Sequence, residues 1–318
     1  MSALAFTLRR LGAMVLLLLV LSFLCFALLG LSPGSPEQLL LGTRPATPEL
    51  LATLRAENHL DEPFLMRYWY WIEGVLHLDL GKSVQTQQNV LDMIVERLPI
   101  TATLALYSTL IALVVAIPAG LISGSRRSGG TDRAVTFAAL VSISAPPFAL
   151  GLLLLYGFAV LLGWFPVYGA GETFIEMVYH LTLPSLTLAA GSAAVIVRQL
   201  RATVIDVIGK DFMTFARARG LSPIRIQVVY LLRNSSLPML TMSGLLLSGS
   251  LAGAVVVEQA FGLAGVGNLL VKAVGQLDIP VVQALALLTG AAVILINLLV
   301  DLAYLAIDPR LRHPRSAT

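Results

Sequence analysis

Six long apolar stretches dominate this sequence, and they restrict its fold more than any other feature. They run over Leu11–Leu31, Leu98–Ser123, Ala134–Leu162, Thr182–Leu200, Leu237–Val257 and Val281–Ile307. At a rise of 1.5 Å per residue, an α-helix of about 20 residues crosses the roughly 30 Å of hydrocarbon in a bilayer. Only 12% of the 318 residues are charged, whereas soluble domains have about a quarter. We therefore predict an all-α polytopic protein in the lipid bilayer, with six transmembrane helices.

Basic residues lie mainly on one side of these predicted spans. On that side are Arg9 and Arg10, Arg126, Arg127 and Arg133, the stretch from Arg198 to Arg233, and Arg310, Arg312 and Arg315. Lysine and arginine are enriched in the cytoplasmic loops of membrane proteins. An even number of spans also places both ends of the chain on the same side. We therefore predict that both termini are cytoplasmic.

The first long segment between spans, residues 32–97, is predicted to be extracytoplasmic. Thr47 and Pro48 are typical of the start of a short helix, with threonine as the N-cap and proline at the first helical position. Further on, Tyr68, Trp69, Tyr70 and Trp71 follow one another. Such a run is typical of an aromatic belt at the membrane interface, and contact with a docking partner is the alternative.

The second long segment, residues 201–236, is predicted to be cytoplasmic and ordered. Asp211 is placed to cap a helix over Phe212–Arg219, and Gly220 is placed to end it. Ser222 and Pro223 then favour the start of another helix, which enters the fifth span through Leu237 and Pro238. Because ordered surface loops often provide docking sites, we predict that this helix-glycine-helix segment binds a partner.

No motif in the chain predicts catalysis or nucleic-acid binding. Gly81, Lys82 and Ser83 resemble the end of a phosphate-binding loop, but Leu76 occupies the position where the motif needs its first glycine. The four histidines show no pair at helical metal-binding spacing; they are His59, His77, His180 and His313. We therefore predict that the chain is not an enzyme and binds neither a metal nor a cofactor.

Polar residues in the last two spans are candidates for the translocation path or a gate. Asn297, Asp301, Tyr304 and Asp308 form one stripe along the last span, and Glu258 ends the fifth. Polar groups at membrane depth usually face the interior of a bundle. A structural hydrogen-bonding role for the stripe is the alternative, and Glu258 suits a pore or the interface equally. Prolines are expected to kink spans at Pro118, Pro146, Pro147 and Pro184.

Several short motifs, in order along nearly the whole chain, resemble the permease subunits of bacterial ABC importers for dipeptides, oligopeptides and nickel. They begin with Leu60–Pro63, Asp79–Gly81, Asp211–Ser222 and Leu232–Pro238, and continue with Glu258–Phe261, Gly265–Gly267, Asp278–Pro280, Asp301–Tyr304 and Asp308–Arg310. The segment Asp211–Ser222 differs from the family pattern at one place. The wider importer signature begins Glu-Ala-Ala, where this chain has Thr214, Phe215 and Ala216.

The resemblance implies the type I importer fold in the bacterial inner membrane. The chain would comprise residues 1–31 as the N-terminal tip and first span, 32–97 as the extracytoplasmic segment, 98–310 as the permease core and 311–318 as a cytoplasmic tail. The implied coupling loop to the ATPases consists of Asp211, Phe212, Thr214, Phe215, Ala216, Arg217, Ala218, Arg219, Gly220, Leu221 and Ser222.

The resemblance also implies the partners of the chain. They are a homologous second permease, two cytoplasmic ATPase subunits that bind ATP and magnesium, and an extracytoplasmic substrate-binding protein. Transport would follow alternating access, driven by ATP-dependent closure of the ATPases. The predicted cargo is a di- or oligopeptide, with nickel or a metal chelate as the alternative. A stand-alone ion-coupled transporter or channel is an alternative of another class.

Overall fold

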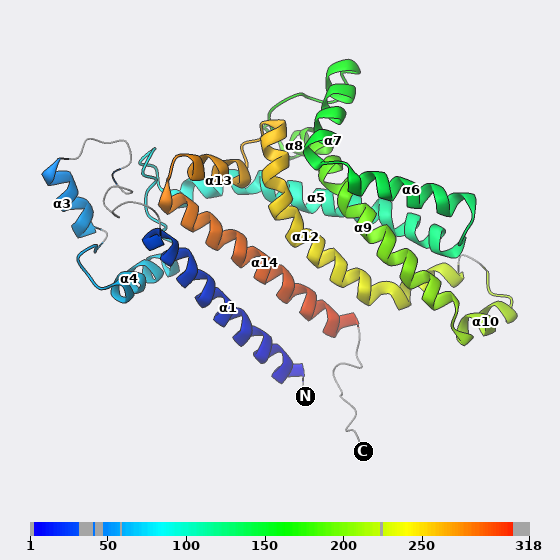
Figure 1. Cartoon of the computed structure of the whole chain (residues 1–318). Coiled ribbons are helices and arrows are strands. Elements are labelled where there is room, and N and C mark those ends of the chain that lie inside the picture. The colour runs from blue at the N-terminus through cyan, green and yellow to red at the C-terminus, as the bar shows by residue number, and fades with distance from the viewer. Residues whose placement is uncertain (1–2, 32–40, 42–46, 58, 223–224, 308–318) are drawn as a thin grey trace. The chain divides into compact units, whose positions relative to one another are not determined.

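The chain is almost entirely helical, as Figure 1 shows for the computed structural model, which describes residues 3–31, 41, 47–57, 59–222 and 225–307. Five described helices are long and apolar enough to cross a membrane. They are α1 (Ala3–Leu31), α5 (Val90–Ser125), α9 (Thr182–Ile208), α12 (Arg233–Phe261) and α14 (Ile279–Ile307). These helices contain most of five of the six predicted spans, and the all-α class is confirmed.

The third predicted span is not one helix. It consists of α6 (Gly130–Ser144) and α7 (Pro147–Leu154), and α7 continues as a π-helix, η1 (Leu155–Leu161). The two arms are bent by 104°. Pro146 and Pro147 explain the break, because neither has an N–H to continue the hydrogen bonds of α6, while Pro147 suits the first turn of α7. The third predicted span is therefore a bent pair of helices, and the kink predicted at these prolines is confirmed.

Shorter helices connect the spans. They are α3 (Pro48–Glu57), α4 (Phe64–Leu76), α8 (Phe174–His180), α10 (Asp211–Ala218), the π-helix η2 (Ile226–Leu232) and α13 (Val266–Gly275). As predicted, α3 begins at Pro48, and the Thr47 hydroxyl accepts a hydrogen bond from the Leu50 amide. The chain divides into two compact units. The first is built mainly from Ala102–Leu263, and the second from Leu4–Thr101 and Ala264–Leu298. The tail 311–318 and Asp308 lie outside the described residues.

The first unit is packed closely because small residues line its helix contacts. In this unit α9 lies between α6 and α12 (Figure 1). A Cβ atom added at Gly120 of α5 would lie 2.9 Å from Cβ of Leu200, and one at Gly124 would lie 2.7 Å from Cβ of Val204. Two glycines four residues apart thus let α5 approach α9 closely, which is a common solution in membrane proteins.

The second unit has its own apolar core and a buried polar anchor. Its core is formed by residues of α5, α13 and α14, among them Val90, Leu269 and Leu285. The carboxylate of Asp278, between α13 and α14, is buried. It accepts hydrogen bonds from the Ser83 hydroxyl at 2.5 Å and the Val84 amide at 3.1 Å. The loop before α5 is thus fixed to a turn almost 200 residues away in sequence.

Candidate functional site

The helix α10 forms the centre of the predicted partner-binding segment, and one of its faces is anchored in the first unit. Met213 and Ala216, three residues apart, are buried. Met213 packs in an apolar cluster with Leu200, Val204 and Leu231. Burial of such a side chain contributes about 2 kcal/mol. The helix is therefore held on the ends of the neighbouring spans rather than in an open loop.

The opposite face of α10 is uncovered and contains two aromatic side chains. Phe215 is 69% exposed, and Phe212 is 40% exposed. The Phe212 ring stacks on that of Tyr230, with centroids 6.3 Å apart. Phe215 is thus the more prominent apolar group of this face. Other exposed residues of α10 and of its C-terminal cap are Asp211, Thr214, Arg217, Ala218 and Arg219. An anchored helix with an exposed phenylalanine and flanking charges suits contact with another protein.

The start of α10 differs from the prediction at one residue. Lys210, with extended backbone torsions, is the N-cap, and no side chain caps the helix. Asp211, which we predicted to be the cap, is instead the first helical residue. Its carboxylate still lies in the first turn, where a negative charge interacts favourably with the helix dipole. The hydrogen-bonding role assigned to Asp211 is therefore wrong.

The end of α10 agrees with the predicted glycine turn. Gly220 has a φ of +71°. Its amide donates to the carbonyl of Arg217 at 2.9 Å, and the Leu221 amide donates to that of Ala216 at 3.4 Å. This pair of bonds defines a Schellman turn, which needs a left-handed residue after the helix. The Ser222 hydroxyl then accepts from the Arg225 amide at 3.4 Å, as the predicted N-cap would. Pro223 lies outside the described residues.

The ordered segment around α10 is shorter than the predicted loop of residues 201–236. The fourth span does not stop at Leu200, because α9 continues to Ile208. On the other side η2 runs directly into α12, which begins at Arg233 and contains Pro238 without a break in the helix. The helix α10 is thus held between two long helices through short connections.

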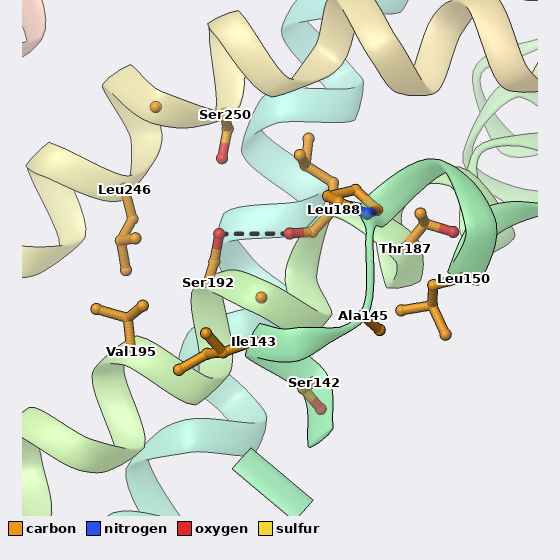
Figure 2. A pocket seen from close by; sticks show the side chains of 13 residues that line it. Ser142, Ile143, Ala145, Leu150, Thr187, Leu188, Ser192, Val195, Leu246 and Ser250 are labelled. Carbon is orange, nitrogen blue, oxygen red and sulfur yellow. Dashed lines mark hydrogen bonds between the residues drawn. The ribbon is translucent and has the colours of Figure 1, made fainter. Parts of the chain in front are cut away.

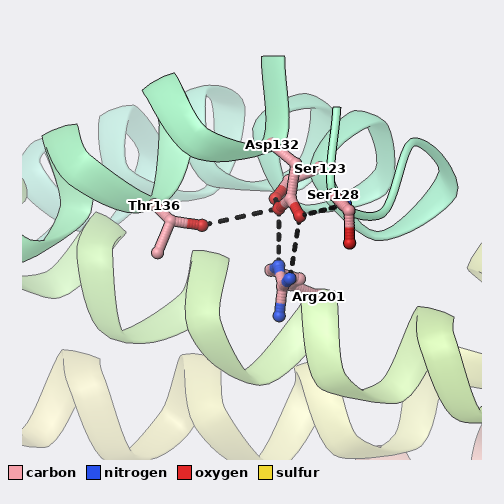
Figure 3. Close-up of polar contacts among 5 residues, drawn as sticks. All are labelled: Ser123, Ser128, Asp132, Thr136 and Arg201. Carbon is pink, nitrogen blue, oxygen red and sulfur yellow. Dashed lines mark hydrogen bonds and ion pairs between the residues drawn. The ribbon is translucent and has the colours of Figure 1, made fainter. Parts of the chain in front are cut away.

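An ion pair between a buried aspartate and a partly exposed arginine, neither of them among the predicted site residues, fixes α9 to α6 near the point where α9 continues toward α10. Asp132 in the first turn of α6 is buried. Arg201 of α9 donates from Nε to one carboxylate oxygen at 2.6 Å and from Nη2 to the other at 2.8 Å (Figure 3). The Ser123 hydroxyl and the Ser128 amide also donate to Asp132 at 2.5 and 2.8 Å.

This cluster joins α5, α6 and α9 through one carboxylate. Removing Arg201 would leave the buried Asp132 carboxylate with fewer donors and should destabilise the unit, whereas the charge of the partly exposed Arg201 is screened by solvent. The sequence contains one local indication of this pair: Asp132 lies among arginines in the short segment between the second and third predicted spans. Its partner, 69 residues away, has no local signature. The cluster therefore holds together the helices α5, α6 and α9, of which α9 leads into α10.

The three candidates for the translocation path lie on α12 and α14. Glu258 of α12 is completely buried. Asn297 is exposed, and its side chain donates to the Val293 carbonyl of the same helix at 2.9 Å. Asp301 and Tyr304 are partly buried on the same helix. Asn297 therefore satisfies its polar group locally, whereas the burial of Glu258 makes it the strongest structural candidate of the three.

The aromatic run of the second unit is divided between an inner and an outer face. Tyr68 and Trp71 pack against Phe26 of α1 with ring centroids 5.7 and 5.6 Å apart, and the Tyr68 hydroxyl lies 2.8 Å from that of Ser22. Trp69 is 61% exposed. Tyr68 and Trp71 thus hold α4 to α1, a packing role that differs from both the predicted membrane belt and the predicted docking contact.

Within the described part of the chain, no group of three His, Cys, Asp or Glu residues is close enough to hold a metal ion. The predicted coupling residues, in contrast, all lie on α10 or in the turn that follows it. These residues therefore form one continuous surface that suits docking.

Comparisons with known proteins agree on one family. Residues 116–313 match the model of the binding-protein-dependent transport system inner membrane component, and residues 3–105 match the N-terminal model of the same systems. The glutathione transport system permease protein GsiC of Escherichia coli O6:H1 is 38% identical over 308 residues, covering 97% of this chain and 99% of that one.

Two further relatives extend the comparison. The dipeptide transport system permease protein DppB of Escherichia coli K12 is 35% identical over 338 residues, covering 98% of this chain and all of that one. Among solved structures, the inward facing methionine ABC transporter MetNI matches with a TM-score of 0.55 and 20% identity, over 68% of this chain and 96% of that one. This likeness supports the predicted importer fold.

Proposed function

The chain belongs to the family of binding-protein-dependent transport system inner membrane components, and from this we propose that it forms part of the translocation pathway of an importer for di- and oligopeptides. Peptides are proposed rather than nickel because two full-length relatives are permeases for glutathione and dipeptides. The pathway would be shared with a homologous second permease, and a substrate-binding protein would deliver the peptide.

The exposed face of α10 is the observation on which the proposed coupling rests. Phe215 is uncovered on a helix that is anchored on its other side by Met213 and Ala216. We propose that a cytoplasmic ATPase subunit receives this face. The chain itself would bind neither ATP nor magnesium, which belong to the two ATPases. With the basic side of the spans in the cytoplasm, α10 and both termini would face the ATPases.

The proposed mechanism is alternating access driven through α10. When ATP closes the two ATPases, they displace the bound helix. Because α10 is packed against the end of α9, and α9 is fixed to α6 by the Asp132–Arg201 pair, the displacement would reach several spans together. The cavity of the transporter would then open toward the binding protein.

The turn at Gly220 provides a test of this coupling. Proline cannot adopt the φ of +71° found there and has no N–H for the bond to Arg217. In proteoliposomes containing the whole transporter, Gly220→Pro should abolish uptake of alanyl-alanine while the protein is still made and inserted. Gly220→Asn is the matched control, because asparagine tolerates the left-handed conformation, and it should retain most of the uptake. Normal uptake by Gly220→Pro would contradict the proposal.

A further inference from the structure

A cavity of about 300 Å³, open on one side, lies in the first unit beside the break between α6 and α7. Figure 2 shows it between α9, α12 and the chain around Ala145. None of the 13 side chains that line it is charged, and several have hydroxyl groups. Its volume is at the lower end of the range for small-molecule sites, about 300–1,000 Å³.

The helix break removes the helical donors for the backbone carbonyls of two residues that line this cavity. In a continuous helix, the carbonyls of Ser142 and Ile143 would accept from the amides of residues 146 and 147. Both positions are proline, which has no N–H. Ser142 and Ile143 both line the cavity. Broken helices with exposed carbonyls form the binding sites of many transporters, where they receive positively charged groups.

The hydroxyl groups around the cavity add to this surplus of acceptors. Ser192 donates to the Leu188 carbonyl at 3.3 Å, as Figure 2 shows, and Thr187 donates to the Leu183 carbonyl at 2.9 Å. Their hydrogens are therefore used, and their lone pairs remain. Ser250 is only 3% exposed, lines the cavity, and has no hydrogen-bond partner among the described residues. The Ser250 hydroxyl oxygen is not among the side-chain atoms that are both fully buried and unpaired, which fits an oxygen that faces the cavity and that a bound ligand can reach.

We propose that this cavity is a transient peptide-binding site that takes the N–H donors of the cargo, its α-ammonium or a backbone amide. The site would provide backbone carbonyls and neutral hydroxyls instead of a carboxylate. Such a site would hold a peptide weakly enough to release it and would read the peptide backbone, not its side chains. The inference rests on the proposed function and assigns a place in this chain to its substrate.

The first test removes the hydroxyl of Ser250. In proteoliposomes containing the whole transporter with saturating binding protein, Ser250→Ala should lower alanyl-alanine uptake about three- to tenfold, the value of one hydrogen bond. Ser185→Ala is the matched control. Ser185 lies on α9, whereas Ser250 lies on α12. The Ser185 hydroxyl is buried and has no hydrogen-bond partner among the described residues, but Ser185 does not line the cavity. Equal uptake by both variants and the native protein would overturn the assignment.

The second test fills the cavity. Gly249 lines it, and a Cβ atom there would meet nothing within 4 Å. Gly249→Leu should therefore lower uptake at least tenfold, while ATP hydrolysis stimulated by the loaded binding protein continues. Gly157→Leu is the control, because Gly157 also has open space but lies outside the cavity lining. Its uptake should remain normal.

Each outcome of the second test has one meaning. If the native complex does not take up alanyl-alanine with ATP, the proposed function fails before any variant is made. If the native complex and Gly249→Leu take it up equally, only the cavity assignment fails. Mass spectrometry of the purified complexes distinguishes a further occupant. A lipid lost from Gly249→Leu together with unchanged uptake would identify a lipid site and overturn the peptide site.

Discussion

Two short helices between spans use aromatic side chains in opposite ways. On α4, Tyr68 and Trp71 turn toward α1 and pack against Phe26. On α10, a methionine and an alanine face the bundle, and Phe215 is left uncovered. Tyr68 and Trp71 of α4 thus contribute mainly to the stability of their own unit. Phe215 gains little from its own unit, which is why we assign the ATPase contact to α10.

The largest effect that this difference predicts is a loss of stability on the α4 side. Phe26 is buried and contacts the rings of Phe64, Tyr68 and Trp71. Phe26→Ala should therefore lower the free energy of unfolding by about 3 kcal/mol, as for other buried phenylalanines. Thermal unfolding of the purified complex in detergent would measure it. Trp69→Ala, which removes an exposed ring of α4, should change the stability by less than about 0.5 kcal/mol. Similar losses of stability in both variants would contradict the conclusion that the rings packed against Phe26 stabilise the second unit.

A smaller effect is expected on the α10 side, and it concerns binding instead of stability. Phe215→Ala should leave the melting temperature unchanged, since the ring is exposed. It should weaken association with the ATPase subunits by about 2 kcal/mol, or about 30-fold, as for a central aromatic residue of an interface. Titration of the purified membrane subunits with the ATPase would measure the dissociation constant. Trp69→Ala serves again as the control, and a loss of ATPase affinity in that variant would argue against the distinction.

The smallest effect concerns the polar capping of α8, a third helix between spans. Thr173 and Glu176 form a reciprocal capping box. The Glu176 carboxylate accepts from the amides of Glu172 and Thr173, and these bonds hold the pKa of Glu176 below its ordinary value. A lowered pKa means that the stabilisation is present above the ordinary carboxyl range and is lost as the pH falls through the lowered value.

Hydrogen exchange over residues 172–181 tests this cap. After correction for intrinsic rates, protection should decrease as the pH is lowered from 6 to 3. In Glu176→Gln the side chain at this position does not titrate. The amide protection of residues 172–181 in this variant should therefore not depend on pH over that range. An equal pH dependence in the two proteins would exclude Glu176 as the titrating cap.

Local sequence signals predicted much of this molecule. The length of the apolar stretches predicted the spans, and the paired prolines predicted the break in the third span. Gly220 predicted the left-handed turn after α10. These features depend on neighbouring residues and on covalent geometry. The N-cap of α10 was misplaced by one residue because Lys210 takes the capping backbone conformation without a capping side chain.

Contacts between distant residues could not be predicted in the same way. The pair of Asp132 with Arg201 and the bonds of Asp278 to Ser83 join residues far apart in sequence. No local periodicity specifies such a pairing, which depends on how the spans pack. The aromatic run over Tyr68–Trp71 was ambiguous for the same reason, because only packing against α1 determines which of its rings are covered.

The most direct test of the central claim asks which of the two helices touches the ATPase. The single cysteine, Cys25, is buried, so Cys25→Ala gives a background in which Phe215→Cys or Trp69→Cys is the only thiol of the chain. In membranes containing the whole transporter, a short thiol-reactive photo-crosslinker at Phe215→Cys should join the chain to the ATPase, with a yield that changes when ATP is added. Trp69→Cys should give no such product. An ATPase adduct from Trp69→Cys, together with none from Phe215→Cys, would contradict the account.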